Sequence, residues 1–289
     1  MKKYLFISSL FVFSISCDVV EGPYITDSES YVNPEKKVLI EDFTGHLCSN
    51  CPEAAREISA IHDAYSEGQV IALAIHTSTS FARPYSASQA PAFQYDFRTS
   101  WGQDWDTDFG ASAIGLPRGM VNRVGNQSPT LGKDEWAALV ADELKKEIDF
   151  KITISSNSTS VTMTSEIQNN ISGNFNYVIC LAESNIINWQ KDGSTNVEDY
   201  VHNHVLRTVL VDEALTSITN FSSGQQIIKT IEYDLAILEQ LNIDYSSVTA
   251  EAGNGNAGGW NAANMSIISY IYNATTNEIL QVEEAYLNN

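Results

Sequence analysis

The fold of the first half of the chain is decided by residues 38–62, which read VLIEDFTGHLCSNCPEAAREISAIH. The apolar run that opens at Val38 predicts a buried strand ending near Phe43. After Cys51, apolar residues recur at helical spacing, so we expect a helix that ends near Ser66. A strand, two cysteines separated by two residues, and a helix therefore follow one another directly.

The segment Cys48-Ser49-Asn50-Cys51 gives this arrangement its chemistry. Thiolate is the reactive form of cysteine, and the unpaired N–H groups and positive dipole end of a helix N-terminus stabilise it. We expect Cys48 to be the exposed nucleophile and Cys51 the recessed thiol that resolves a mixed disulfide. His46, two residues before Cys48, can add positive charge when it is protonated.

Further elements are predicted on the C-terminal side of this stretch. A strand is expected at 70–75, strand character returns at 120–121, and 133–148 form an amphipathic helix. Between them, 78–112 are irregular and rich in aromatic side chains. These aromatics either line a groove for a peptide or glycan or pack the segment onto the domain, and we favour packing.

The residues from 149 to the end have the alternating pattern of β-strands. Two short alternating runs, 151–155 and 160–164, predict a hairpin. Further strand-like runs lie at 175–182, 205–211, 226–233 and 265–273. We expect an all-β domain here, with a sandwich as the architecture that fits best. Cys180 lies in one of these apolar runs and is expected to be a small buried hydrophobic residue.

The beginning of the chain has the features of a signal peptide over residues 1–16. Two lysines precede an apolar run that is too short to span a bilayer as a stable helix. Small residues precede Cys17 in a segment that resembles a lipobox, where the cysteine is acylated and becomes the mature N-terminus. Lipid attachment at Cys17 is expected, with cleavage without lipid as the alternative. The polar residues 17–36 then form a tether.

The overall charge limits the partners. With 16 Lys and Arg against 36 Asp and Glu, the formal net charge is -20. A field of that sign repels phosphate backbones, so nucleic acid is not expected as a partner. In an exported protein, the oxidising surroundings allow Cys48 and Cys51 to be joined as a disulfide.

Around the cysteine pair the chain resembles thioredoxins. In that family a buried acid lies six residues before the first cysteine and assists proton transfer at the recessed thiol; Asp42 occupies that position. A cis-proline faces the disulfide in thioredoxins, and Leu116-Pro117 matches that segment, so the resemblance implies that both residues bind a peptide substrate. Leu47 stands where thioredoxins usually have a tryptophan, and Ser49-Asn50 replace the usual Gly-Pro.

The whole layout is similar to a family of Bacteroidetes-type outer-membrane lipoproteins, named after an outer-membrane protein of about twenty-eight kilodaltons. The resemblance is carried by the lipoprotein signal, by residues 43–52 and by residues 202–207 in the β-rich half. It implies attachment to the outer membrane and does not define a reaction. The expected segments are a signal peptide (1–16), a tether (17–36), a thioredoxin-like α/β domain (37–148) with an insertion (78–112), and the all-β domain (149–289).

Two functions are compatible with these patterns. The first is a thiol–disulfide oxidoreductase of the cell envelope acting on protein thiols or disulfides, with Cys48, Cys51 and Asp42 as catalytic residues. The second is a non-enzymatic binding or assembly subunit of an outer-membrane complex, in which the Cys48–Cys51 disulfide is structural. Neither needs a bound cofactor, because a dithiol is itself a redox centre. No metal is expected, since a zinc site needs ligands that do not accompany this cysteine pair.

Overall fold

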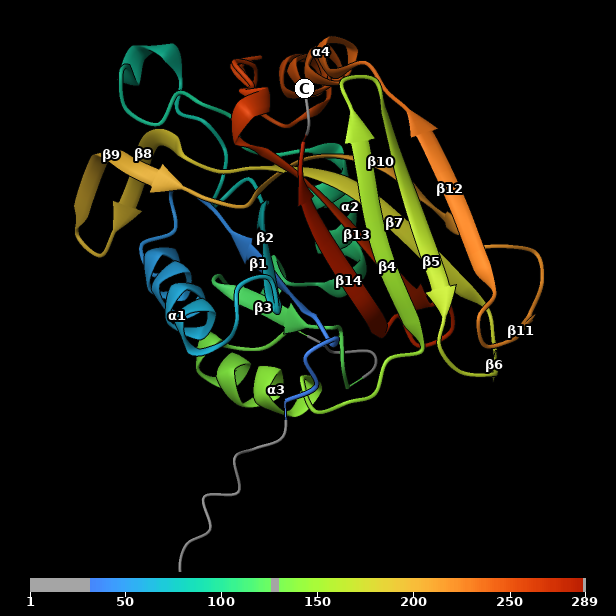
Figure 1. The fold of residues 1–289 in the computed structure, drawn as a ribbon. Helices are drawn as coiled ribbons and strands as arrows, with labels where there is room; N and C mark the ends of the chain where they lie inside the picture. The colour runs from blue at the N-terminus through green and yellow to red at the C-terminus, as the bar shows by residue number, and fades with distance from the viewer. Residues whose placement is uncertain (1–31, 126–129, 288–289) are drawn as a thin grey trace, which may run out of the picture. The chain divides into compact units, whose positions relative to one another are not determined.

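The stretch around the cysteine pair forms a strand, a helix and a second strand, as predicted. The computed structural model describes residues 32–125 and 130–287. In it β1 spans Val38–Thr44, α1 spans Cys51–Ala64 and β2 spans Val70–His76. β2 runs parallel to β1, and α1 connects the two across one face of the sheet (Figure 1).

These strands belong to a seven-stranded mixed sheet, in the order β14-β13-β7-β10-β2-β1-β3. The remaining members are β3 (Arg118–Val121), β7 (Phe175–Glu183), β10 (Val205–Ala214), β13 (Met265–Asn273) and β14 (Ile279–Tyr286). The described residues form one compact unit. The boundary expected between residues 148 and 149 therefore runs through a shared sheet. The two halves of this sheet meet where β10 lies parallel to β2, with Val205 opposite Ala74.

A further all-β region covers the half of the sheet built from the C-terminal strands. A three-stranded sheet orders β12 (Gln226–Glu232), β5 (Ser160–Ile167) and β4 (Phe150–Asn157), and the predicted hairpin is its β4–β5 pair. Apolar side chains of β4 and β5 share one core with those of β7 and β13. Two smaller sheets pair β8 (Ile186–Asp192) with β9 (Thr195–His202) and β6 (Ile171–Ser172) with β11 (Asn220–Phe221).

The other helices differ from the predicted ones. The helix expected at 133–148 is a 3₁₀ turn, Lys133–Glu135, followed by a shorter α3, Trp136–Glu143. The insertion contains one α-helix, α2, which spans Ser100–Phe109. A further helix in the second half of the chain, α4, spans Leu235–Asp244 and was not predicted. Single turns of 3₁₀ helix lie at Ala87–Gln89, Ser112–Ile114 and Ala262–Asn264, and a π-helical turn lies at Tyr245–Thr249.

Side chains of β1 alternate between two cores, as strand geometry requires. Val38 and Ile40 pack with α1 and α3, whereas Leu39 and Phe43 pack with side chains of β7, β10 and β13 on the opposite face. By the same alternation Asp42 belongs to the face that α1 covers. All seven residues of the strand are buried.

The end of the expected tether is part of the body. The Asn33 backbone N–H donates to the Leu144 carbonyl at 2.8 Å, and Lys36 is buried with its ammonium bonded to the Leu280 carbonyl. Residues 1–31, with the expected signal peptide and Cys17, lie outside the described residues. Within the described part of the chain, no helix combines the length and apolar character that crossing a bilayer requires.

Candidate functional site

The two cysteines of the site are joined as a disulfide, as predicted. Cys51 is the first residue of α1, and the Cα atoms of Cys48 and Cys51 lie 5.4 Å apart. The turn between them is closed by the Cys51 N–H, which donates to the Cys48 carbonyl at 3.4 Å. The pair thus lies where a helix N-terminus favours negative charge on sulfur.

The expected exposure of Cys48 is wrong. Cys48 is 2% exposed, as is Cys51. On one side the insertion covers the loop before the disulfide, where the Leu47 N–H donates to the Phe81 carbonyl at 2.8 Å. Gly45 is required here, because a Cβ at this position would lie 2.2 Å from the Phe81 carbonyl oxygen.

On the other side the hairpin β8–β9 covers the same loop. The buried Gln190 side chain donates its amide N–H groups to the carbonyls of Cys48 at 3.1 Å and Gly45 at 3.3 Å. Backbone N–H groups of the hairpin add two more bonds of 2.8 Å, from Lys191 to the His46 carbonyl and from Gly193 to the Ser49 carbonyl. Residues from the second half of the chain therefore seal the cysteine pair.

The predicted cis-proline segment lies at the same end of the sheet. The Leu116–Pro117 peptide bond is cis. β3 begins directly after it and pairs antiparallel with β1, with Arg118 opposite Phe43. The Leu116 side chain belongs to the same core cluster as both cysteines. The structure therefore brings together the disulfide and the Leu116-Pro117 segment.

Asp42 is a buried carboxyl group without a charged partner. It is 3% exposed, and its Oδ1 has no hydrogen-bond partner among the described residues. Burial raises the pKa of Asp42 to about 8, so the group is mainly protonated at neutral pH. The carboxyl group lines a cavity of about 390 Å³ between α1, β2 and β9. An unpaired buried acid is costly to a fold and is a common feature of functional sites.

His46 does not supply the positive charge that its position before Cys48 would allow. It is buried, and desolvation lowers its pKa to about 4, so it is neutral at pH 7. Its ring lies beside Phe97, which also stacks on His76 and contacts His202. Burial lowers the pKa of both of these histidines as well. The three imidazoles therefore act as a neutral, packed cluster next to the disulfide loop.

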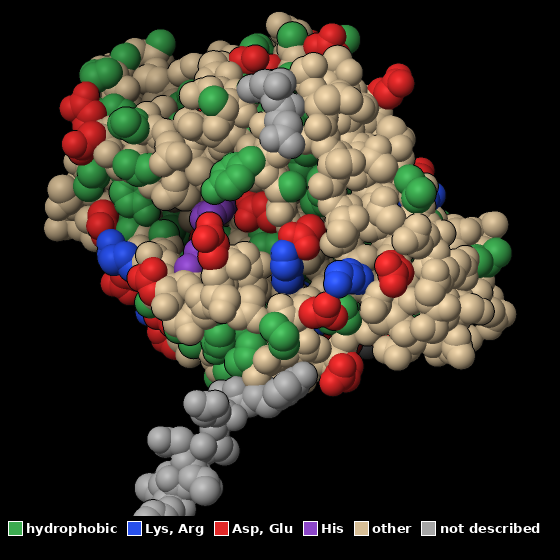
Figure 2. All heavy atoms as spheres, viewed as in Figure 1, with side chains coloured by type: hydrophobic (Ala, Val, Ile, Leu, Met, Phe, Trp, Pro, Cys, Tyr) green, Lys and Arg blue, Asp and Glu red, His purple; other side chains and the backbone are tan. Residues whose placement is uncertain are grey.

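His202 and His204 contact different parts of the protein. His202 is the last residue of β9 and points into the cluster around Phe97. His204 follows in a left-handed conformation, with φ of 56°, and its ring centroid lies 5.5 Å from that of His62 on α1. In the space-filling view, histidine side chains are recessed in a hollow with acidic and basic side chains nearby (Figure 2).

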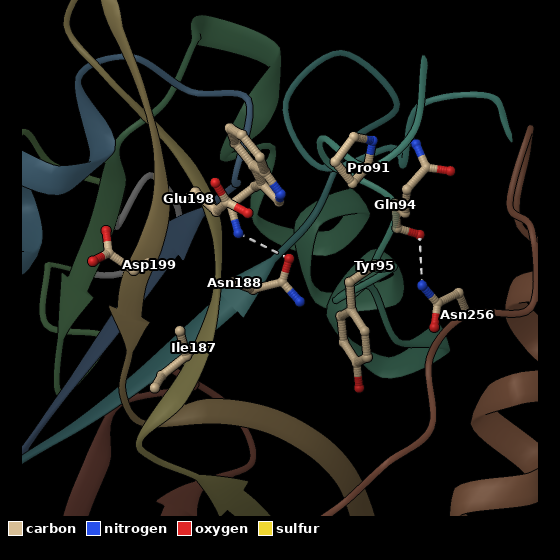
Figure 3. Close-up of a pocket in the computed structure, with 9 residues that line it drawn as sticks. Pro91, Gln94, Tyr95, Ile187, Asn188, Glu198, Asp199 and Asn256 are labelled. Carbon is tan, nitrogen blue, oxygen red and sulfur yellow. Dashed lines mark hydrogen bonds between the residues drawn. The ribbon is translucent and has the colours of Figure 1, made fainter. Parts of the chain in front are cut away.

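The aromatic insertion mainly packs, as favoured from the sequence. Phe93 and Phe97 are buried, and Tyr95 donates its hydroxyl to the Ala257 and Gly258 carbonyls. Beside it lies a groove of about 740 Å³, in which residues of the insertion face residues of the hairpin β8–β9 (Figure 3). The lining residues are Pro91, Gln94, Tyr95, Ile187, Asn188, Trp189, Glu198, Asp199 and Asn256.

Cys180 and the acidic residues at 104–108 have structural roles. Cys180 is buried and free, as predicted. The acidic run at 104–108 lies in α2, where buried Asp106 accepts hydrogen bonds from Thr77 and Ser112. In the described ranges, no group of three or more His, Cys, Asp or Glu side chains is placed to hold a metal ion.

These features define a class of protein: a mixed α/β protein with a disulfide at a helix N-terminus, sealed by a β-hairpin from its second half. The profile of the family described as outer membrane protein Omp28 matches residues 104–257, more than half of the chain. The chain belongs to this family, which confirms the resemblance seen in the sequence and the outer-membrane location. No curated protein matches the chain.

Several solved structures are similar to this chain at low sequence identity, and the first of them shares its fold. HBP35 of Porphyromonas gingivalis has a TM-score of 0.55 at 16% identity, covering 88% of this chain and 76% of that one. A structural-genomics protein from Agrobacterium tumefaciens has a TM-score of 0.48 at 12% identity, covering 88% and 95%. A domain of the outer membrane lipoprotein Omp28 from Porphyromonas gingivalis has a TM-score of 0.26 at 14% identity, covering 50% and 91%.

Proposed function

We propose that this outer-membrane protein is a thiol–disulfide oxidoreductase of the cell envelope, with a thioredoxin-like framework in its first half. The observation that carries the proposal is Asp42, whose buried carboxyl group has an unpaired oxygen and lies on the face of β1 that α1 covers. A structural disulfide does not require such a group, whereas a recessed thiol that must gain and lose a proton does.

The proposed chemistry assigns one role to each residue. In the oxidising direction, a thiolate of a substrate dithiol attacks the Sγ of Cys48, and the Cys51 sulfur leaves and takes the proton of Asp42. The second substrate thiol, once deprotonated, attacks the first substrate sulfur, which is bonded to Cys48 in the mixed disulfide. The substrate disulfide forms and the Cys48 thiolate is released. The substrate loses two electrons and the protein gains them as a dithiol. Leu116 and Pro117 border the position of the substrate peptide.

The sealed disulfide adds a requirement to this mechanism. A sulfur in a residue that is 2% exposed cannot meet a protein thiolate until its cover moves. The hairpin β8–β9 is the element that we propose to move, because a few hydrogen bonds join it to the loop and one exposed ion pair, Arg56–Asp192, joins it to α1. We therefore propose that access to Cys48 is gated.

An insulin-reduction assay tests the activity, with a Cys48→Ser variant as control. We expect turnover by the wild type and none by the variant. A Cys51→Ala variant should accumulate mixed disulfides with substrate proteins, because its intermediate cannot be resolved. Wild-type turnover equal to that of Cys48→Ser would remove the proposal.

One observation favours a second function, that of a non-enzymatic subunit of an outer-membrane complex with a structural disulfide. It is the burial of both cysteines beneath the hairpin. The reduction potential separates the two functions: a value below about -300 mV marks a structural bond, and a higher value favours catalysis. Co-purification of a stable partner from membranes would support the second function.

The anchor and the architecture of the second half complete the proposal. We propose that Cys17 carries the lipid and that the three-stranded sheet and the C-terminal strands form a sandwich. A Cys17→Ala variant should move from the membrane fraction to the soluble fraction of the envelope, since acyl chains supply the membrane affinity. Unchanged membrane association of the variant would contradict lipid attachment at this residue.

A further inference from the structure

The cavity beside Asp42 is lined by residues of α1, β2 and β9 and by the segment that leads from β9 to β10. Ala72 and Ala74 of β2 line it, and their small side chains leave the space above Asp42 unfilled. His62 and His204 line the same cavity, and both also line a neighbouring cavity of about 560 Å³ at the surface. The histidine pair is thus common to the inner cavity of Asp42 and the outer one.

The two imidazoles lie side by side at the wall of this cavity. Their ring centroids are 5.5 Å apart, and Nε2 of His62 is buried without a hydrogen-bond partner among the described residues. Burial lowers the pKa of both histidines, so each ring is neutral near pH 7 and carries one N–H donor and one nitrogen acceptor. The inner cavity is lined by both apolar and polar side chains and is large enough to hold water beside its polar groups.

The backbone holds His204 in this position at a cost. Its φ of 56° is a left-handed conformation that is strained for a residue with a Cβ atom. The conformation is fixed by two bonds: its N–H donates to Ser184 Oγ at 3.0 Å, and its carbonyl accepts from the Ala74 N–H at 2.8 Å. The neighbouring Val205 lies opposite Ala74, which in turn lies opposite Asp42 across the sheet.

We propose that His62 and His204, with water in the cavity, form the path by which Asp42 exchanges protons with solvent. The inference rests on the proposed function and extends it to residues outside the cysteine motif. His62 and His204 are positioning and relay residues; they touch neither sulfur nor substrate. Asp42 is the group that serves the Cys51 thiol directly.

The path matters most when the protein is reoxidised by a small disulfide. The Cys48 thiolate attacks glutathione disulfide, forms a mixed disulfide and releases one glutathione thiolate. Asp42, protonated at pH 7, must first lose its proton to the cavity before it accepts the proton of Cys51. The Cys51 thiolate then attacks Cys48 Sγ, so that the protein disulfide forms and the second glutathione leaves. Two electrons pass to glutathione disulfide.

Other charged and titratable groups face this path and contribute to its pH dependence. Arg56 on α1 and Tyr200 on β9 face Asp42, and Asp63 on α1 and Glu284 on β14 face His62. Lys37 and Glu283 form an ion pair at the wall of the outer cavity. A comparison between variants that leave these groups in place isolates the contribution of the histidine pair.

The test is the plateau rate of reoxidation by glutathione disulfide at saturating concentration, which isolates the intramolecular Cys51 step. Fluorescence of Trp105, in the same core cluster as both cysteines, reports the reaction. At pH 7 we expect His62→Gln to slow this step roughly tenfold, because glutamine keeps hydrogen bonding but cannot take up a proton. Added imidazole should restore the rate. Glu57→Gln on the same helix is the control and should leave the rate unchanged.

A double variant distinguishes a relay from a general structural effect. If His62 acts through Asp42, Asp42→Asn combined with His62→Gln should be no slower than Asp42→Asn alone. Each measurement is repeated in proteins that also carry Gln190→Ala, so that movement of the hairpin away from the disulfide does not limit the rate. The proposal is overturned if His62→Gln reoxidises at the wild-type plateau rate both alone and in combination with Gln190→Ala. It is also overturned if the effects of Asp42→Asn and His62→Gln add up in the double variant. If the wild type is inactive in the insulin assay, the proposed function fails. The reoxidation rates with glutathione disulfide can still be compared between the variants, so the two failures are distinguishable.

Discussion

Asp42 links the stability of the fold to pH. Because burial raises its pKa from 3.8 to about 8, the folded chain keeps a proton that the unfolded chain releases above pH 4. The unfolded state therefore binds fewer protons across this range, and stability falls as the pH rises from about 4 to about 8. Each pH unit within this range lowers the free energy of unfolding by at most ~1.4 kcal/mol.

Asp42→Asn should remove this dependence, because an amide stays neutral at every pH. We expect the variant to exceed the wild type by a few kcal/mol at pH 9 and to have no advantage at pH 4, as measured by urea unfolding of the oxidised proteins. Asp63→Asn, an exposed change on α1, serves as the control. Equal stabilities of wild type and Asp42→Asn at pH 9 would show that the carboxyl group is not desolvated.

A second residue-scale prediction concerns the buried ion pair between Arg123 and Glu41. The guanidinium donates to both carboxylate oxygens and to the Tyr270 hydroxyl. Arg123→Met leaves Glu41 buried and unpaired, and should cost about 3–5 kcal/mol of unfolding free energy. Arg56→Met removes the exposed pair with Asp192 and should cost less than about 1 kcal/mol. Similar losses for both variants would contradict this ranking.

Sequence reasoning identified the cysteines and Asp42 because their spacing in one strand–helix unit is local. It did not find His62 and His204 as partners, since they lie on separate elements and the left-handed backbone of His204 has no signature in the sequence. The charge state of His46 could not be predicted from the sequence. A histidine charge depends on burial, which here comes from Phe97 and from distant histidines.

At the scale of elements, the hairpin β8–β9 decides how accessible the disulfide is. Gln190→Ala deletes two buried hydrogen bonds to the disulfide loop, each worth about 1 kcal/mol. We expect dithiothreitol to reduce the Cys48–Cys51 bond roughly tenfold faster in this variant, as followed by thiol labelling over time. Asp192→Asn weakens only an exposed contact of the hairpin and should change the rate little. A rate in Gln190→Ala equal to that of the wild type would show that the hairpin does not control access.

Elements with a clear period were predicted and the others were not. β1, α1 and the β4–β5 hairpin follow simple apolar patterns over several residues. The strands of the covering hairpin have mixed exposure and no strict alternation, because one side of the hairpin rests on the disulfide loop. The helix expected up to residue 148 ends at Glu143, where the chain turns into β4.

At the scale of the whole molecule, both halves of the chain build one sheet. The core on one face of β1 takes buried side chains from β7, β10 and β13, among them Val178, Leu206 and Ile268. A fragment of residues 32–148 exposes this apolar face and leaves β2 without its neighbour β10. We expect the fragment to unfold without a cooperative transition, whereas the full chain unfolds in one step by circular dichroism and by Trp136 fluorescence. A cooperative transition of the isolated fragment would show that the first half is an independent folding unit.

The position of the hairpin in the sequence also fixes an order of events after translocation. The cysteine loop leaves the membrane about 140 residues ahead of Gln190, which later closes over it. In that interval both sulfurs face the oxidants of the envelope. Once the second half has folded, the bond is shielded. The oxidation state of the pair is therefore set during biogenesis. The mature protein preserves it until the hairpin moves away from the disulfide loop.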